Sequence, residues 1–294
     1  MNRQTLKDFL KSKIEHLYGT QFNEIVDGIF SILYGENYKS IKQKRDLGSD
    51  GIIETEKISL ACYAPERYDK PKFEKKVDED YGKYKKNYMS LGYKWRFITN
   101  QKLLGSIVTY IKNKSTDAEV WGIEELINFI LNLPPSKRRK ILLDIFSLST
   151  ELIEFDFVEE VIEEISKLKK EVSDYCPQYN LPKDTSKKIE KNFSGEDIEI
   201  VKRKFIHFYA EYIGYLQKVL NTLDNDFISN MKMTVLREYQ FLYKKLTFKE
   251  RFDHLVNRFS SKYPKDQEYK NYVELILLYL FEQCLIGTKS EVDK

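Results

Sequence analysis

The chain has 294 residues, of which 41% are hydrophobic and 14% aromatic; this composition supports buried cores, excludes a disordered protein and leaves room for two domains. The net charge of +3 is too small to identify a nucleic-acid-binding protein by itself. Three scattered cysteines without metal-ligand spacing, and no apolar run of membrane-spanning length, predict a cytoplasmic protein with reduced thiols and no membrane partner.

Residues 3–34 carry apolar side chains at helical spacing, and Gly19-Thr20 divides them into two predicted helices. Gly35 occupies the position that commonly follows a helix C-terminus. The second predicted helix includes Glu24, which the helical pattern alone assigns to the solvated surface.

The stretch from Tyr38 to Glu66 predicts two β-strands that meet at a polar turn. The turn contains a basic cluster at residues 42–45 and the small-residue segment Gly48-Ser49-Asp50-Gly51, and a second apolar run follows from Lys57 to Ala64. Asp50 is well placed to hold a divalent cation, because it lies between small residues just before a strand. Gly48 and Gly51 would allow positive φ and the close approach of a phosphate.

Helices and strands alternate after Pro65. Apolar positions spaced three and four residues apart predict a helix over residues 70–88. The expected elements that follow are a strand over 93–99, a helix over 103–111, a strand over 118–121 and a helix over 124–131. The resulting order, α-α-β-β-α-β-α-β-α, predicts an α/β domain of three layers with a mixed central sheet over residues 1–135.

No strand is predicted from Ser136 onward, so residues 136–294 are expected to form an all-α domain. One of its helices carries seven acidic residues and no basic residue between Glu151 and Glu164. Ser194 and Asp197 form a plausible capping pair for a long helix that continues through Leu223.

The segments GSDGII at residues 48–53 and ISLACYAPE at residues 58–66 resemble the core of the PD-(D/E)xK, or restriction-endonuclease-like, nuclease fold. The resemblance implies a DNA endonuclease that uses Mg²⁺ and has Asp50 as its metal anchor. It also implies that the first core helix directs Glu24 toward the metal ion. Asp46 or Glu66 could add a third carboxylate ligand.

The second motif of that fold departs from the family pattern. It falls on Ala61-Cys62-Tyr63, so an alanine replaces the acidic ligand and Tyr63 occupies the position of the catalytic lysine. Tyr63 can only hydrogen-bond near neutral pH, so the missing cation would have to come from another lysine, and the candidates are Lys57, Lys70 and Lys72. Two hypotheses therefore stay open, an endonuclease with a degenerate or partner-activated site and a catalytically inactive subunit that binds DNA or a partner.

The hydrophobic ending from Tyr272 to Gly287 resembles the C-terminal helical domains of bacterial ABC-three-component conflict systems. This resemblance implies an antiviral defence effector that docks onto an SMC-like ABC ATPase, with a small middle component encoded nearby. Residues 1–135 hold 22 Lys and Arg against 19 Asp and Glu, and the remainder holds 27 of each. The positive excess thus lies in the domain expected to meet DNA, although an ordinary solvated surface accounts for it as well.

Overall fold

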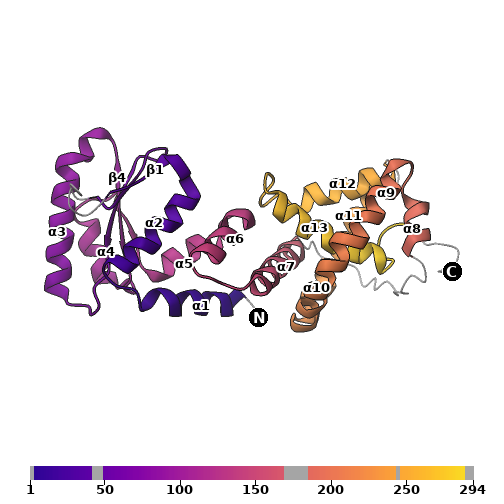
Figure 1. Cartoon of the computed structure of the whole chain (residues 1–294), viewed down its shortest axis with the longest axis horizontal. Coiled ribbons are helices and arrows are strands. Elements are labelled where there is room, and N and C mark those ends of the chain that lie inside the picture. The colour runs from indigo at the N-terminus through magenta and orange to yellow at the C-terminus, as the bar shows by residue number, and fades with distance from the viewer. Residues whose placement is uncertain (1–2, 42–48, 169–184, 243–245, 289–294) are drawn as a thin grey trace. The chain divides into compact units, whose positions relative to one another are not determined.

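A computed structural model describes residues 3–41, 49–168, 185–242 and 246–288. Its contacts divide the chain into two compact units, which are drawn in Figure 1. The sheet unit comprises residues 4–133 and 137–148, and the helical unit comprises residues 1–3, 134–136 and 149–294. No helix in the described part of the chain is both long and apolar enough to cross a membrane.

The sheet unit has a five-stranded sheet in the order β1-β2-β3-β4-β5. Pairing is antiparallel from β1 to β3 and parallel from β3 to β5, so the sheet is mixed, as the sequence predicts. Its strands are β1 (Tyr38–Ser40), β2 (Gly51–Ile53), β3 (Ile58–Tyr63), β4 (Lys94–Thr99) and β5 (Glu119–Trp121). The structure therefore has three strands between residues 38 and 64, where the sequence predicted two.

Six helices accompany this sheet among the described residues. They are α1 (Arg3–Glu15), α2 (Thr20–Tyr34), α3 (Lys70–Asn87), α4 (Gly105–Lys112), α5 (Ile123–Leu131) and α6 (Pro135–Asp144). Short 3₁₀ segments, η1 (Gly35–Asn37) and η3 (Met89–Leu91), precede β1 and β4. All five helices predicted between residues 3 and 131 are present, with bounds that differ by a few residues, because their apolar spacing is clear in the sequence.

Helices cover both faces of the sheet. On one face, side chains of α3 and α4 form a buried cluster with Trp95 and Phe97 of β4. On the other face, Phe30 of α2 contacts Trp121 of β5 and Phe129 of α5. Figure 1 shows α3 on one side of the sheet and α2 and α5 on the other. The arrangement has three layers, and it buries β3 and β4 on both faces.

The division between the units does not coincide with the predicted boundary at residues 135 and 136. Residues 137–148 cluster with the sheet unit. Their apolar side chains pack there, since Ile145 lies so close to Gly28 of α2 that a Cβ on the glycine would come within 2.6 Å of it. The Lys137 ammonium also donates a hydrogen bond to the Leu33 carbonyl oxygen at 2.6 Å.

The helical unit contains no strand among its described residues, in agreement with the sequence. Its helices are α7 (Thr150–Lys167), α8 (Thr185–Asn192), α9 (Glu196–Arg203), α10 (Ala210–Thr222), α11 (Asn225–Leu242), α12 (Phe248–Phe259) and α13 (Gln267–Glu282). A π-helical segment, Lys204–Tyr209, joins α9 to α10. The predicted Ser194–Asp197 side-chain cap is wrong, because α9 begins after Gly195 and has no side-chain capping hydrogen bond.

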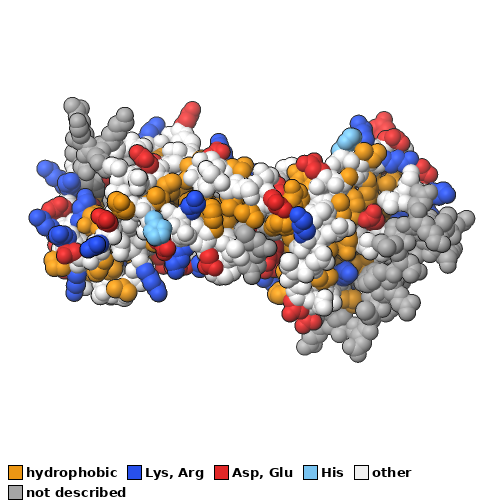
Figure 2. Space-filling view, turned by 60° about the horizontal axis from the view of Figure 1, so that its bottom comes forward, with side chains coloured by type: hydrophobic (Ala, Val, Ile, Leu, Met, Phe, Trp, Pro, Cys, Tyr) orange, Lys and Arg blue, Asp and Glu red, His pale blue; other side chains and the backbone are white. Residues whose placement is uncertain are grey.

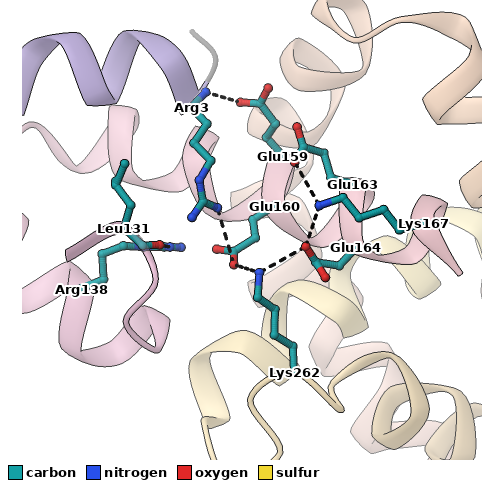
Figure 3. A network of polar contacts seen from close by, with 9 residues as sticks. All are labelled: Arg3, Leu131, Arg138, Glu159, Glu160, Glu163, Glu164, Lys167 and Lys262. Carbon is teal, nitrogen blue, oxygen red and sulfur yellow. Dashed lines mark hydrogen bonds and ion pairs between the residues drawn. The ribbon is translucent and has the colours of Figure 1, made fainter. Parts of the chain in front are cut away.

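Acidic side chains of α7 are buried at the centre of the helical unit, where this helix packs against α10, α11 and α13. Figure 3 shows part of the polar network that holds them. Glu160 forms ion pairs with Lys262 at 2.7 Å and with Arg3 at 3.7 Å. Glu159 accepts a hydrogen bond at 3.1 Å from the Arg3 backbone N–H. The acidic residues in the middle of α7, Glu154, Asp156, Glu159 and Glu160, are therefore part of the core and not a solvated surface.

Replacing Glu159 is expected to change stability in a pH-dependent way. Burial raises the pKa of Glu159 to about 7 from an ordinary 4.5, and the negative charges of Glu163 and Asp156 add to the shift. A raised pKa means that ionisation costs free energy in the folded state, so this residue destabilises the helical unit progressively from about pH 4.5 to pH 7. Glu159→Gln should therefore raise the free energy of unfolding above pH 7, by up to about 3 kcal/mol, with little effect near pH 4.5.

Urea unfolding at the two pH values tests this expectation. Both tryptophans, Trp95 and Trp121, lie in the sheet unit, so tryptophan fluorescence follows the sheet unit alone. Circular dichroism follows the helices of both units, so a dichroism transition that fluorescence does not show belongs to the helical unit. Glu211→Gln on the exposed surface of α10 is the matched control and should have the same small effect at both pH values. A stabilisation by Glu159→Gln that is equal at acidic and alkaline pH would contradict the prediction.

Candidate functional site

A pocket of about 320 Å³ lies where the first half of α2 meets the end of β1 and the beginning of β2. It is lined by Thr20, Asn23, Glu24, Asp27, Ser40, Ile41 and Asp50. Three of these residues carry carboxylates. The pocket thus brings together Asp50 and Glu24, which lie 26 residues apart in the sequence and were both predicted as metal ligands.

Asp50 is held by hydrogen bonds at the beginning of β2. Its backbone N–H donates to the Leu60 carbonyl oxygen at 2.8 Å, and its own carbonyl oxygen accepts from the Ile41 N–H at 2.9 Å. Its carboxylate oxygen Oδ2 accepts from the Cys62 N–H at 2.6 Å. These contacts bind Asp50 to both neighbouring strands, so the position of its carboxylate is fixed by the backbone of the sheet.

Glu24 and Asp27 lie one turn apart on α2, and this spacing puts both side chains on one face of the helix. The Glu24 side chain is exposed and the Asp27 side chain is half-buried. Asp27 accepts hydrogen bonds from the hydroxyl groups of Tyr38 and of Ser40, the latter at 2.7 Å. The sequence interpretation missed Asp27, although its spacing of three residues from Glu24 was the available signal.

Tyr38 reaches Asp27 by passing over Gly51. A Cβ atom at Gly51 would lie 2.3 Å from the Tyr38 hydroxyl oxygen, so only glycine leaves room for the ring. Gly51 does not have the positive φ that the sequence predicted, because its role is to allow this close approach. Burial and the hydrogen bond to Asp27 raise the pKa of Tyr38 far above its usual range, so the phenol remains a proton donor to the carboxylate.

Tyr63 does not line the pocket. Its ring packs against the buried cluster under α3, with its centroid 5.6 Å from that of Phe73, and burial raises its pKa. Ala61 shares this face of β3, and alternation along the strand turns Cys62 to the opposite face. The structure therefore separates Tyr63 from Asp50 and Glu24, although the sequence resemblance grouped the three.

The other predicted ligands and cations also lie away from the pocket or outside the described residues. Glu66 is exposed in the loop between β3 and α3 and is not a lining residue. Lys57, Lys70 and Lys72 are not lining residues either. Asp46, Gly48 and the basic cluster at residues 42–45 all fall among residues 42–48, which lie outside the described residues.

Burial and the neighbouring charge of Asp50 raise the pKa of the Cys62 thiol well above its ordinary value. The thiol is therefore protonated near neutral pH, as is typical of a buried, inert cysteine.

The donor set of the pocket is suited to a hard divalent cation. Within the described residues, no group of three or more His, Cys, Asp and Glu side chains is close enough to hold a metal ion by itself. Mg²⁺ does not require such a cage, because it keeps several water ligands and is often bound through one or two carboxylates. Asp50 and Glu24 are the residues that would hold it. A comparison of the chain with models of protein families found no match, and neither did comparisons with curated proteins and with solved structures.

Proposed function

We propose that the sheet unit is a Mg²⁺-dependent DNA endonuclease and that the protein is an effector of an antiviral defence system. The observation that carries this proposal is the pocket, whose lining includes both Asp50 and Glu24 and which lies where α2 meets two strands of a mixed sheet. The helices on both faces of that sheet are also consistent with the resemblance of residues 48–66 to the restriction-endonuclease-like fold.

The proposed reaction is hydrolysis of a phosphodiester bond. A bound Mg²⁺ ion would polarise a phosphoryl oxygen and lower the pKa of a coordinated water. Asp50 would hold the ion with a carboxylate that the sheet backbone fixes through Cys62. Glu24 would contribute a second carboxylate from α2, and its exposure leaves this side of the pocket open to substrate.

Docking is the role that we propose for the helical unit. The resemblance of its last helix to those of ABC-three-component systems supports an SMC-like ABC ATPase, together with a small middle component, as the partner. The apolar side chains of α13 are buried in the core of the helical unit, so they do not form a surface for a partner. The docking surface is therefore expected on the outer helices and not on α13.

A second function is favoured by one observation. Strand β3 turns Leu60 and Cys62 to the face opposite Tyr63, so it contributes neither a lysine nor a carboxylate to that face. Restriction-endonuclease-like catalysis relies on a cation to stabilise the negative charge of the transition state. A sheet unit that binds DNA without cutting it is the alternative that follows from this strand.

Incubation of the full chain with supercoiled plasmid tests the two functions. We expect nicked or linear DNA with Mg²⁺ or Mn²⁺, when the chain is incubated alone or together with the proteins encoded by neighbouring genes. No product is expected with EDTA. Glu66→Gln should not lower the rate, because this exposed side chain lies outside the pocket. Binding of the plasmid without cleavage under every condition would instead support the non-catalytic function.

A further inference from the structure

Three loops of the sheet unit are tied together beside the pocket, and we refer to residues 16–19, 64–69 and 100–104 as the loop rim. The buried side chain of Asn100 donates to the carbonyl oxygens of Leu17 at 2.9 Å and of Pro65 at 3.2 Å. The Gly19 N–H donates to the Ala64 carbonyl oxygen at 2.9 Å. These bonds cross between all three loops, so the rim is a fixed surface. It continues into the pocket, because Thr20 is a lining residue.

Two tyrosines of the loop rim are exposed to solvent. Tyr18 is 48% exposed and Tyr68 is 38% exposed. Tyr68 rests against Phe73, with ring centroids 5.5 Å apart, and this contact holds the ring while leaving much of it in water. Among the described residues, no aromatic ring stacks on Tyr18. Large aromatic surface is thus presented to solvent on a rigid support.

The loop rim also carries two basic side chains that form no ion pair with any described residue. Arg67 and Lys102 are exposed, and neither forms a salt bridge with a described residue. Three lysines of the nearby helix α3 are different, since Lys70, Lys75 and Lys76 pair with acidic residues four positions further along the helix. Of the two carboxylates on the rim, Asp69 accepts the Lys72 N–H as the N-cap of α3, and Glu66 is exposed. Arg67 and Lys102 therefore remain available for phosphate groups.

We propose that the loop rim binds single-stranded nucleic acid, with bases stacked on Tyr18 and Tyr68 and phosphates contacted by Arg67 and Lys102. Aromatic rings stack on any base that is unpaired, whereas the bases of a duplex are already stacked on one another. The proposal rests on the proposed function only in that the bound strand would lead into the carboxylate pocket; binding itself requires neither metal nor cleavage.

Fluorescence anisotropy of a labelled oligothymidylate of about 15 nucleotides, near the upper site size of single-strand-binding folds, tests the proposal. The full chain is titrated in EDTA, so no cleavage occurs. Tyr18→Ala should weaken binding roughly 5- to 150-fold, the range for loss of one stacked base, whereas Tyr18→Phe should bind as the wild type. Tyr68→Ala and Tyr68→Phe should form a second pair with the same outcome. Arg67→Gln should lower the slope of log Kd against log salt by about 0.7.

The control is Leu91→Ala, which removes another exposed apolar side chain from η3 before β4 and should leave affinity unchanged. Equal affinity of the wild type and both alanine variants, or tighter binding of a duplex of the same length, would overturn the proposal. Plasmid cleavage without oligonucleotide binding would overturn single-strand binding by the loop rim and leave the proposed endonuclease function standing. Binding without any plasmid cleavage would leave the rim assignment standing and remove the endonuclease.

Discussion

Asp50→Asn is expected to reduce plasmid cleavage roughly 100- to 1,000-fold, the usual cost of losing one preorganised electrostatic group from an active site. The substitution removes the negative charge that would hold Mg²⁺ and keeps the size of the side chain. The amide oxygen can still accept the Cys62 N–H, which lies 2.6 Å from the carboxylate in the wild type. The backbone bonds of residue 50 to Ile41 and Leu60 are unaffected, so the variant should fold normally.

Asp78→Asn is the matched control for this experiment. Asp78 lies on the surface of α3, where it pairs with Lys114 at 2.8 Å, and the loss of such an exposed pair costs about 1 kcal/mol or less. Its cleavage rate should equal that of the wild type. Tryptophan fluorescence of both variants in urea checks that the sheet unit is folded. An Asp50→Asn protein that cuts plasmid at the wild-type rate would remove the nuclease assignment from this pocket.

Phe30→Ala is expected to lower the free energy of unfolding of the sheet unit by about 3–5 kcal/mol, the range for removing a buried phenylalanine side chain. The Phe30 ring is completely buried. Its ring centroid lies about 6 Å from those of three other rings in the same core, 5.9 Å from Tyr38, 6.2 Å from Trp121 and 6.0 Å from Phe129. The cavity left by the substitution would therefore border α2, both edges of the sheet and α5.

Urea unfolding followed by tryptophan fluorescence measures this effect, because Trp121 contacts the substituted ring. Phe241→Ala in α11 is the matched control. Phe241 is 83% exposed, so its removal should change the free energy of unfolding by about 0.5 kcal/mol or less. Loss of Phe30 should also loosen Tyr38 and its hydrogen bond to Asp27. A stability change for Phe30→Ala no larger than that of the control would show that α2 is not packed on the sheet in this way.

The elements of the sheet unit were largely predictable from the sequence, because their signals are local. Helical spacing of apolar residues predicted α2 and α3, and alternation predicted β4. Asp50 was recognisable as a polar residue between small ones before a strand, and it does lie immediately before β2. The extra strand was missed because β1 and β2 have three residues each, too few to establish a period.

The composition of the site depended on contacts between distant residues. Both faces of β3 are covered, so its residues form a continuous buried run, and such a run does not reveal which side chains face the pocket. Tyr63 was predicted in the site because it occupies the lysine position of the resembling motif, whereas its ring packs under α3. Asp27 joined the pocket only because Tyr38 and Ser40 of β1 return to α2.

The loop rim and the boundary of the units were likewise decided by tertiary structure. Nothing in the local sequence links Asn100 with Leu17, which is 83 residues away, or with Pro65. Residues 137–148 were predicted as part of the all-α domain, and packing of Ile145 on α2 assigned them to the sheet unit. Local spacing determined which elements form, since backbone hydrogen bonding and side-chain periodicity act over a few residues. Close packing of side chains from distant segments determined which of them meet.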